Sequence, residues 1–379
     1  MGFISKEFVT KMVEFDVIIV GAGPAGSTAA QTLVEENFNV LLIEEHKEIG
    51  LPQHCSGWIS GSEYTNELMK TIPKNLIVQK VTGWRVWSPH GKKVCEFDDF
   101  GFGGYFVDRA NFDRELAKKA AKKGAKIKIS SKMVDLFIEN NIIKGVTISS
   151  KGISENITAD VIIGADGVRS YSSGVARKSG IAELEKKPRE FFPAMQVEFI
   201  NIADIDPGII EIFFGFDFDK NFGMAFLSPL DENWALIGFG NYKDYLKIKE
   251  VHPVLSERLK EADEIRYLGG MFCSKFGESL KIAVRNNVAL IGDAAGYHGI
   301  IPACISGYYA SDITKHAIQQ EDFSYLNEYD KIRRRSTIKS AQMAIDIRAL
   351  NDEKIEQFLQ MGGKDATYTM LELISKLKI

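Results

Sequence analysis

The sequence predicts a mixed α/β (α+β) protein: a Rossmann-like nucleotide-binding domain with an inserted, largely antiparallel β-sheet domain and a helical C-terminal region. In the βαβ unit over 15–44, a short apolar run ends in glycines, and a helix-compatible stretch then leads to a second apolar run. Segments near 81–106 and 190–275 alternate with period two and are rich in aromatic residues, as antiparallel strands are. Most of the chain after Gly307 has the pattern of helices.

The order of these segments predicts a discontinuous nucleotide-binding domain that is interrupted twice by pieces of the sheet domain. A chain of 379 residues is long enough for two domains that pack closely together. The expected segments are 1–80, 105–175 and 276–322 for the nucleotide-binding domain, 81–104 and 176–275 for the sheet domain, and 323–379 for the helical region.

The composition narrows the class of protein. A net charge of −4 provides no basic field, so nucleic acid is not an expected partner. The four cysteines are scattered and form no CxxC pair, so we expect neither a disulfide scaffold nor a metal site. No secretory leader opens the chain, and no apolar run reaches the roughly 18 residues of a spanning helix. We therefore expect a cytoplasmic protein that at most lies on a membrane.

The βαβ unit carries a dinucleotide fingerprint. Gly21 permits the tight turn off the strand, Gly23 lets the backbone approach a pyrophosphate, and Gly26 lets helix and strand pack closely. Glu44 ends the second strand, where a carboxylate can accept hydrogen bonds from ribose hydroxyls, and an acid there disfavours a 2′-phosphate. The fingerprint predicts a bound dinucleotide without separating FAD from NAD.

Two later motifs make that separation. A buried strand runs into Asp166-Gly167, and another runs into Gly292-Asp293, followed by a helix-compatible stretch. A carboxylate at the C-terminal end of a buried strand lies where open α/β sheets bind ligands, and Asp293 is placed to accept from a ribityl hydroxyl. With the fingerprint, these motifs predict FAD.

The three motifs together resemble the flavoproteins built like the aromatic-ring hydroxylases. Within that group, 49–57, which contains Cys55-Ser56-Gly57, is similar to the Cys-x-Gly segment of the geranylgeranyl reductase family. The segment 104–117 resembles the one in which these enzymes place an arginine, here Arg109, near the flavin. Gly296 stands where the hydroxylases usually have histidine. The resemblance covers nearly the whole chain, but 222–229 and 301–307 depart from the family's aromatic and glycine-rich segments.

The motifs and the resemblance imply three sets of site residues. The expected cofactor-binding residues are Gly21, Gly23, Pro24, Ala25, Gly26, Glu44, Glu45, Cys55, Ser56, Gly57, Arg109, Val134, Asp166, Gly167, Gly292, Asp293, Gly296 and Ile305. The expected catalytic residues are His54, Cys55, His298 and Cys304, and the expected substrate-binding residues are Phe213, Phe226, Pro229, Trp234 and Pro302.

Several of these residues have a second interpretation. Cys55 and Cys304 are hypothesised to form a disulfide or a redox pair, although free cysteines are more often packing residues. Arg109 either holds the flavin or an electron donor, or forms an ion pair with Asp113. A loop histidine is usually only solvated. The phenylalanines of the sheet domain either line a tunnel for a polyprenyl chain or form an ordinary core.

The resemblance implies an FAD-dependent oxidoreductase that saturates isoprenoid C=C bonds of a prenyl lipid or lipid precursor. Its electrons would come from transiently bound NAD(P)H or from a ferredoxin-like protein. The alternatives are a monooxygenase or halogenase of the same fold, and an electron-transfer flavoprotein that donates to a quinone or a protein. The basic stretch 331–339 and an apolar helix face with Met370, Leu373, Ile374 and Leu377 suggest peripheral membrane contact, or else a helix docked on its own domain.

Overall fold

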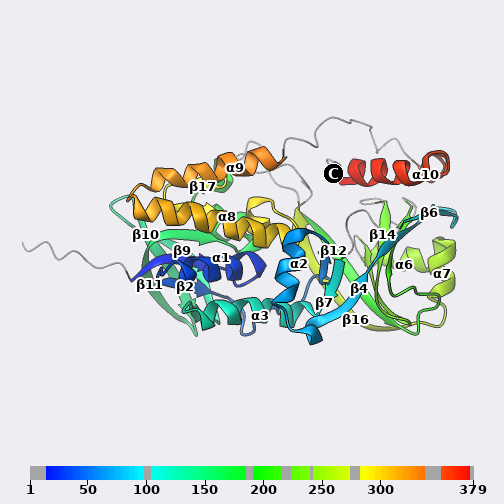
Figure 1. The fold of residues 1–379 in the computed structure, drawn as a ribbon, viewed down its shortest axis with the longest axis horizontal. Helices are drawn as coiled ribbons and strands as arrows, with labels where there is room; N and C mark the ends of the chain where they lie inside the picture. Colours follow the sequence, from blue (N-terminus) through cyan, green and yellow to red (C-terminus); the bar gives the residue numbers. More distant parts are fainter. Residues whose placement is uncertain are drawn as a thin grey trace, which may run out of the picture.

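Three β-sheets organise the chain, and helices lie along one flank of the first (Figure 1). The computed structural model describes residues 14–97, 104–184, 191–215, 223–239, 242–273, 282–337 and 351–375. The site residues expected from the sequence all fall within these ranges. The segment 222–229 is described from residue 223 onward.

The first sheet contains the predicted βαβ unit. Its strand order is β17-β18-β11-β1-β2-β8, and β9 and β10 continue it antiparallel from the first half of β11. Strands β1, β2, β8, the second half of β11 and β18 run parallel. The strands are β1 (Phe15–Val20), β2 (Val40–Ile43), β8 (Lys126–Lys128), β9 (Ser131–Glu139), β10 (Ile142–Ser150), β11 (Ile153–Gly164), β17 (Val284–Arg285) and β18 (Val288–Leu290).

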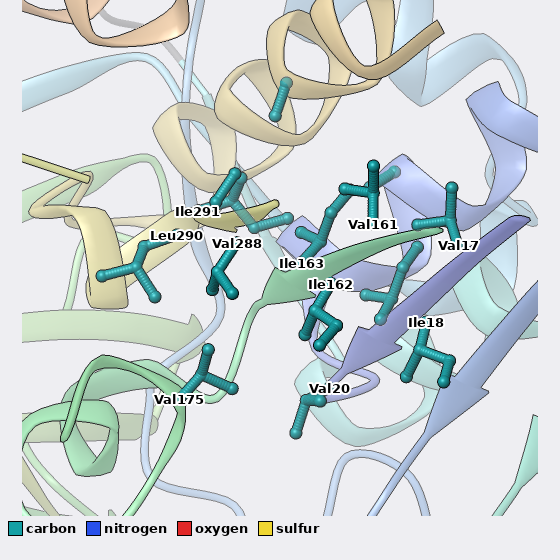
Figure 2. Packing of buried hydrophobic residues seen from close by; sticks show 14 of the residues in the cluster. Val17, Ile18, Val20, Val161, Ile162, Ile163, Val175, Val288, Leu290 and Ile291 are labelled. Atoms are coloured by element: carbon teal, nitrogen blue, oxygen red, sulfur yellow. The ribbon is translucent and has the colours of Figure 1, made fainter. Parts of the chain in front are cut away.

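The parallel strands are short apolar runs because both faces of this sheet are covered. Figure 2 shows Val17 and Ile163 pointing to the opposite side of the strands from Ile18 and Ile162, and all four are fully buried. Helix α1 packs against both α3 and α8. The bounds are α1 (Pro24–Glu35), α3 (Arg109–Lys122) and α8 (Ile300–Gln319).

The second sheet is largely antiparallel, with the order β16-β12-β15-β14-β13-β5-β6, and only β5 and β13 pair in parallel. One of its faces packs under α6 (Tyr242–Val251) and α7 (Pro253–Arg258). Its strands are β5 (Gly83–Trp87), β6 (Lys93–Phe97), β12 (Phe191–Ile200), β13 (Ile209–Phe214), β14 (Met224–Asp231), β15 (Trp234–Phe239) and β16 (Asp263–Cys273).

The third sheet links the other two. It has the order β3-β7-β4, with β3 (Trp58–Ser60), β4 (Ile77–Val81) and β7 (Gly104–Val107). Phe106 of β7 is buried with Ile210 of β13, so this small sheet packs on the face of the second sheet that α6 and α7 leave open. Helix α2 (Glu63–Lys70) and the 3-10 turn η1 (Lys74–Leu76) complete this region.

One expected domain boundary is wrong in its position. The sequence predicts that 176–184 belong to the sheet domain, but this stretch contains most of α4 (Val175–Lys178) and all of α5 (Ile181–Leu184). Ala176 and Ile181 are buried in the core of the first sheet, so the chain leaves that domain only after α5. Helices α4 and α5 are too short to show a helical period in the sequence, so the sequence pattern does not reveal this domain boundary.

The C-terminal region occupies two separate places. The 3-10 turn η4 (Phe323–Leu326) and α9 (Asn327–Thr337) lie beside α8 on the first domain, whereas α10 (Asp352–Ser375) packs against β6 (Figure 1). Arg333, in the expected basic stretch, is buried and paired with Asp330 at 3.0 Å, so this residue does not face a membrane. The side chains of the expected apolar face at 370–377 lie outside the described residues. Across the described ranges, none of the helices is long and apolar enough to cross a membrane.

Candidate functional site

The fingerprint glycines differ in whether the protein itself requires them. Gly21 has φ +107°, and a Cβ there would lie 2.4 Å from the carbonyl oxygen of Ala165. A Cβ on Gly26 would lie 1.9 Å from the carbonyl oxygen of Gly21. A Cβ on Gly23 would meet no protein atom within 4 Å, and its backbone is extended, with φ −75° and ψ −171°. Packing therefore explains Gly21 and Gly26, whereas the space at Gly23 fits a phosphate group held outside the chain.

The first turn of α1 is suited to that phosphate. Gly23 is its N-cap residue and provides no side-chain cap, Pro24 follows, and the first turn contains no acidic residue. The N–H groups of the first turn and the positive end of the helix dipole then face the same open space. This fits a pyrophosphate such as that of FAD.

Glu44 follows β2 and lies beside the glycine loop. One carboxylate oxygen accepts from the Ala22 N–H at 3.0 Å, and the other accepts from the His46 N–H at 2.9 Å. The His46 ring nitrogen Nδ1 lies 2.7 Å from the second oxygen. The side chain of Glu44 is 12% exposed, so the carboxylate is held in a fixed orientation with an open edge for ribose hydroxyls. Glu45 pairs instead with Arg169 at 3.0 Å.

Asp166 follows β11 by two residues and is half-buried. Its Oδ2 accepts from the Val175 N–H at 2.7 Å. Burial raises the pKa of Asp166 to about 6, against hydrogen bonds from Ser170 and Val175 that lower it. Its Oδ1 is buried without a hydrogen-bond partner among the described residues. A donor from a bound cofactor would satisfy this oxygen, which again fits FAD. Gly167 and the half-buried Val134 of β9 lie in the same region of the first domain.

Asp293 and His298 lie in the turn between β18 and α8. Asp293 belongs to the 3-10 turn η3 (Gly292–Ala295), and its side chain is 40% exposed. His298 is 11% exposed, and its Nδ1 lies 3.3 Å from Asp293 Oδ1. The carboxylate is therefore accessible to a ribityl hydroxyl, while the histidine orients it from behind. Gly296, Pro302 and Ile305 lie around this turn and in the first two turns of α8.

The loop 49–57 contacts both domains. Cys55 Sγ accepts from the Gly57 N–H at 3.4 Å. On the other side, Gln53 accepts a hydrogen bond from Arg266 of β16 at 3.3 Å, and His54 lies against Gly270. His54 is exposed, and its ring is 3.3 Å from the carbonyl oxygen of Pro52. The loop therefore spans the junction between the two large sheets, with Ser56 and Cys55 half-buried in it.

Arg109 forms a buried, bidentate ion pair with Asp113, with N–O distances of 2.8 and 3.1 Å. Burial alone would lower the pKa of Arg109, but Asp113 and Cys55 raise it, so the guanidinium keeps its charge. The ion-pair interpretation is confirmed, and the contact with Cys55 places the same guanidinium beneath the loop. A direct contact of Arg109 with the flavin stays a prediction.

Cys304 does not have the surroundings of a catalytic thiol. It is fully buried on α8, and its Sγ donates to the Pro24 carbonyl oxygen at 3.8 Å. Burial raises the pKa of Cys304 to about 11, so it remains a thiol at neutral pH. Cys55 and Cys304 are both free, so no disulfide joins them. The catalytic assignment of Cys304 is corrected: this residue packs beneath the first turn of α1.

Helices α6 and α7 cover one face of the second sheet, and the expected substrate-binding residues are divided between this face and the opposite one. Phe213, expected to bind substrate, is fully buried under α6 and α7, where it stacks on Trp87 at 6.2 Å. Pro229 pairs with Ala235 on that same covered face. Both assignments are corrected, because strand register turns these side chains away from the first domain. Phe226 pairs with Gly238 on the opposite face and is half-buried, as the substrate assignment requires.

Sequence patterns missed the polar residues on the open face of this sheet. Glu198 is buried and accepts from the Trp234 ring N–H at 2.7 Å and from Arg266. Gln196 lies on the same face, one pleat away. Alternation marks β12 as a strand, but only the pairing with β15 and β16 brings these side chains to the loop 49–57. No group of three or more His, Cys, Asp or Glu suited to a metal ion occurs among the described residues.

Comparisons with known proteins show the family to which the chain belongs. Residues 16–297 match the family described as FAD dependent oxidoreductase. The digeranylgeranylglycerophospholipid reductase of Methanosarcina acetivorans is 32% identical, over 96% of this chain and 92% of that protein. The enzyme of the same name from Thermoplasma acidophilum is 30% identical, over 85% of this chain and 83% of that protein.

Solved structures show the same fold. A geranylgeranyl bacteriochlorophyll reductase-like protein from Thermoplasma acidophilum aligns with a TM-score of 0.78 at 24% identity, covering 94% of this chain and 95% of that one. A flavin-dependent brominase aligns with a TM-score of 0.68 at 17% identity, covering 96% and 93%. The chain therefore belongs to the FAD-dependent oxidoreductases and, with its curated relatives, to the digeranylgeranylglycerophospholipid reductase family, and its cofactor is FAD.

Proposed function

We propose that the protein saturates C=C bonds in the isoprenoid chains of a membrane lipid or of its precursor, as the names of its curated relatives describe. The observation that carries the proposal is the apolar half of the open sheet face. Val86, Ile212 and Phe214 are fully buried there, and Phe226 on the same face is half-buried, so part of its ring is accessible to a ligand. A polyprenyl chain is apolar along its whole length, so such a face is complementary to it.

Reduced FAD, when bound, supplies the hydride for one alkene carbon, and the second carbon takes a proton. An isolated alkene is a poor hydride acceptor, so the chain's own residues must hold the bond in place and exclude water. Phe226 of β14 is proposed to contact the chain, with the buried side chains of β5 and β13 beside it. Arg109 and Asp113 fix the loop that carries Cys55 from below.

Cys55 and His298 are the proposed proton-holding groups. The Cys55 thiol is half-buried in the loop between the two domains, and His298 is oriented by Asp293. His54 is exposed and lies against β16, which fits a contact between domains better than proton transfer. Separate C55S and H298N variants distinguish the two, because only loss of the true proton donor changes the pH profile of the reduction.

The electron donor is proposed to be NAD(P)H, bound transiently, or a ferredoxin-like protein. The chain has one dinucleotide fingerprint, which the FAD site uses. Peripheral membrane contact is proposed because the substrate is a lipid, and co-sedimentation with vesicles tests it. The identity of the electron donor is tested by mixing the oxidised protein with each donor in turn, anaerobically. The loss of flavin absorbance shows which donor reduces the flavin.

The function is tested with dithionite-reduced protein, anaerobically, on a geranylgeranylated glycerophospholipid. The expected product, identified by mass spectrometry, gains two hydrogens for each double bond reduced, and FAD is reoxidised in equal amount. A hydroxylated or halogenated product in air would identify an oxygen-dependent enzyme instead. Rapid flavin oxidation by a quinone, with no lipid product, would identify an electron-transfer flavoprotein.

A further inference from the structure

The open face of the second sheet is divided into two chemically different halves. Strands β5, β13 and β14 supply the apolar half. Strands β12, β15 and β16 supply the polar half. Glu198 pairs with both Leu236 and Arg266, and this register places four polar or aromatic side chains on the same face: Gln196, Glu198, Trp234 and Arg266. We call these four residues, together with Gln53 of the loop 49–57, the polar track. It runs from the middle of the sheet to the edge strand β16.

Hydrogen bonds hold the polar track together. Glu198 is buried, and its two carboxylate oxygens accept from the Trp234 ring N–H at 2.7 Å and from Arg266 Nε. Arg266 Nη1 donates to Gln53 at 3.3 Å. Its Nη2 donates to none of the residues that the structure describes, and the side chain is 48% exposed. The guanidinium is therefore fixed by its neighbours and still has donors available at the surface.

Gln196 provides a second polar group, and this one is unsatisfied. Its Oε1 is buried and has no hydrogen-bond partner among the described residues. It lies beside Gly238, where a Cβ would be 3.5 Å from Gln196 Cγ, so no side chain covers it from that strand. A buried carbonyl oxygen without a donor is unfavourable, and a hydroxyl group of a ligand would satisfy it.

We propose that the polar track binds the phosphate-bearing polar end of an amphiphilic prenyl lipid, whose chain runs toward the half-buried Phe226. Arg266 Nη2 would donate to the phosphate, since guanidinium groups bind phosphate oxygens strongly. Glu198 would repel an anion, but Arg266 and Trp234 already engage both of its oxygens. The proposal rests on the proposed function and deepens it, because it gives the substrate a direction in the site.

The test compares geranylgeranyl phosphate with geranylgeraniol, which has the same chain and no phosphate. Binding to the FAD-loaded protein is measured by quenching of tryptophan fluorescence, and reduction by kcat/KM. We expect the wild type to favour the phosphate by about tenfold or more. Arg266→Gln should remove this preference and Arg266→Lys should keep part of it. Lys247→Gln, on the exposed side of α6, is the matched control and should change nothing.

Two further variants make the test independent of folding. Gln53→Leu frees Arg266 from the loop without leaving Glu198 unpaired, and should reduce the phosphate preference if Arg266→Gln does not fold. Gln196→Leu, of similar shape, should weaken binding of the alcohol as well as the phosphate. An unchanged phosphate preference in folded Arg266→Gln, or in Gln53→Leu if the former fails to fold, overturns the proposal. Wild-type protein that binds the phosphate selectively but reduces no prenyl compound overturns the proposed function and not the polar track.

Discussion

At the scale of single residues, two of the three fingerprint glycines are required by packing within the protein, and the third is not. Gly21 and Gly26 are required by the backbone around them, whereas Gly23 has an ordinary conformation and open space where its side chain would be. The packing roles of Gly21 and Gly26 are predicted from the sequence and confirmed, because they follow from the geometry of a strand-to-helix turn, and the role of Gly23 at a phosphate stays a prediction. The sequence could not predict that Cys304 is fully buried, since burial depends on how α8 packs on α1.

Gly23→Val should therefore weaken FAD binding by a hundredfold or more, on the order of 3 kcal/mol, because the side chain occupies the phosphate space. The FAD-free variant should keep the melting temperature of the wild type. Gly26→Val is the matched comparison and should destabilise the FAD-free protein, since its Cβ collides with Gly21. Titration of FAD by flavin fluorescence and calorimetry of the FAD-free proteins measure both. Equal destabilisation by the two variants would contradict this division of roles.

Asp166 should make the FAD-free protein less stable as pH rises. Its folded pKa of about 6 lies above the ordinary carboxyl value of 3.8, so the folded state binds the proton more tightly. The stabilisation is complete below about pH 4 and is lost as pH rises through 6, with a total cost of about 3 kcal/mol. Asp166→Asn should lack this loss, which urea unfolding at pH 4.5 and pH 7.5 measures. A parallel pH dependence in the two proteins would refute it.

At the scale of elements, strand register decides which residues reach the site. Period two identified β12 to β16 as strands, but it did not say which side of each strand faces the first domain. The sequence predicts that Phe213 and Pro229 bind substrate, but both lie under α6 and α7, whereas Phe226 lies on the opposite face. A strand's faces are fixed by pairing across the sheet, and a single sequence does not contain the pairing. For the same reason, the small sheet of β3, β4 and β7 was not foreseen.

The start of α7 should make this domain sensitive to acid. His252 is its N-cap residue, and its Nε2 lies 3.1 Å from the carbonyl oxygen of Ser88. Burial lowers the pKa of His252 to about 4, from the usual 6.5. The stability from the neutral ring is present above pH 6.5 and is lost as pH falls through 4, about 3 kcal/mol in all.

His252→Gln should reduce stability at pH 7.5 but show a smaller loss between pH 6.5 and 4 than the wild type. Urea unfolding at several pH values, with Asp166 unchanged in both proteins, isolates the histidine. His90→Gln is the control, because the His90 side chain is 57% exposed. An identical acid loss in wild type and His252→Gln would mean that another group is responsible.

At the scale of the whole molecule, the cofactor site is assembled from distant parts of the chain. The residues expected to surround it, which are the glycine loop, Glu44, the loop 49–57, Asp166 and Asp293, lie far apart along the chain. FAD at a hundredfold excess over its Kd should therefore stabilise the entire fold by about 2.7 kcal/mol. Calorimetry with and without added FAD measures this. A melting transition that FAD leaves unchanged would show that the site is not formed by the folded state.

The contact between α1 and α8 can form only late during synthesis of the chain on the ribosome. A Cβ on Gly307 would lie 2.5 Å from the carbonyl oxygen of Ala25, so the two helix backbones touch directly behind the phosphate-binding turn. Residues 15–44 leave the ribosome first, but this support follows only after some 260 more residues have been added. We therefore expect nascent chains released before residue 300 to be unable to retain FAD, so that FAD is acquired only after α8 (Ile300–Gln319) has been synthesised.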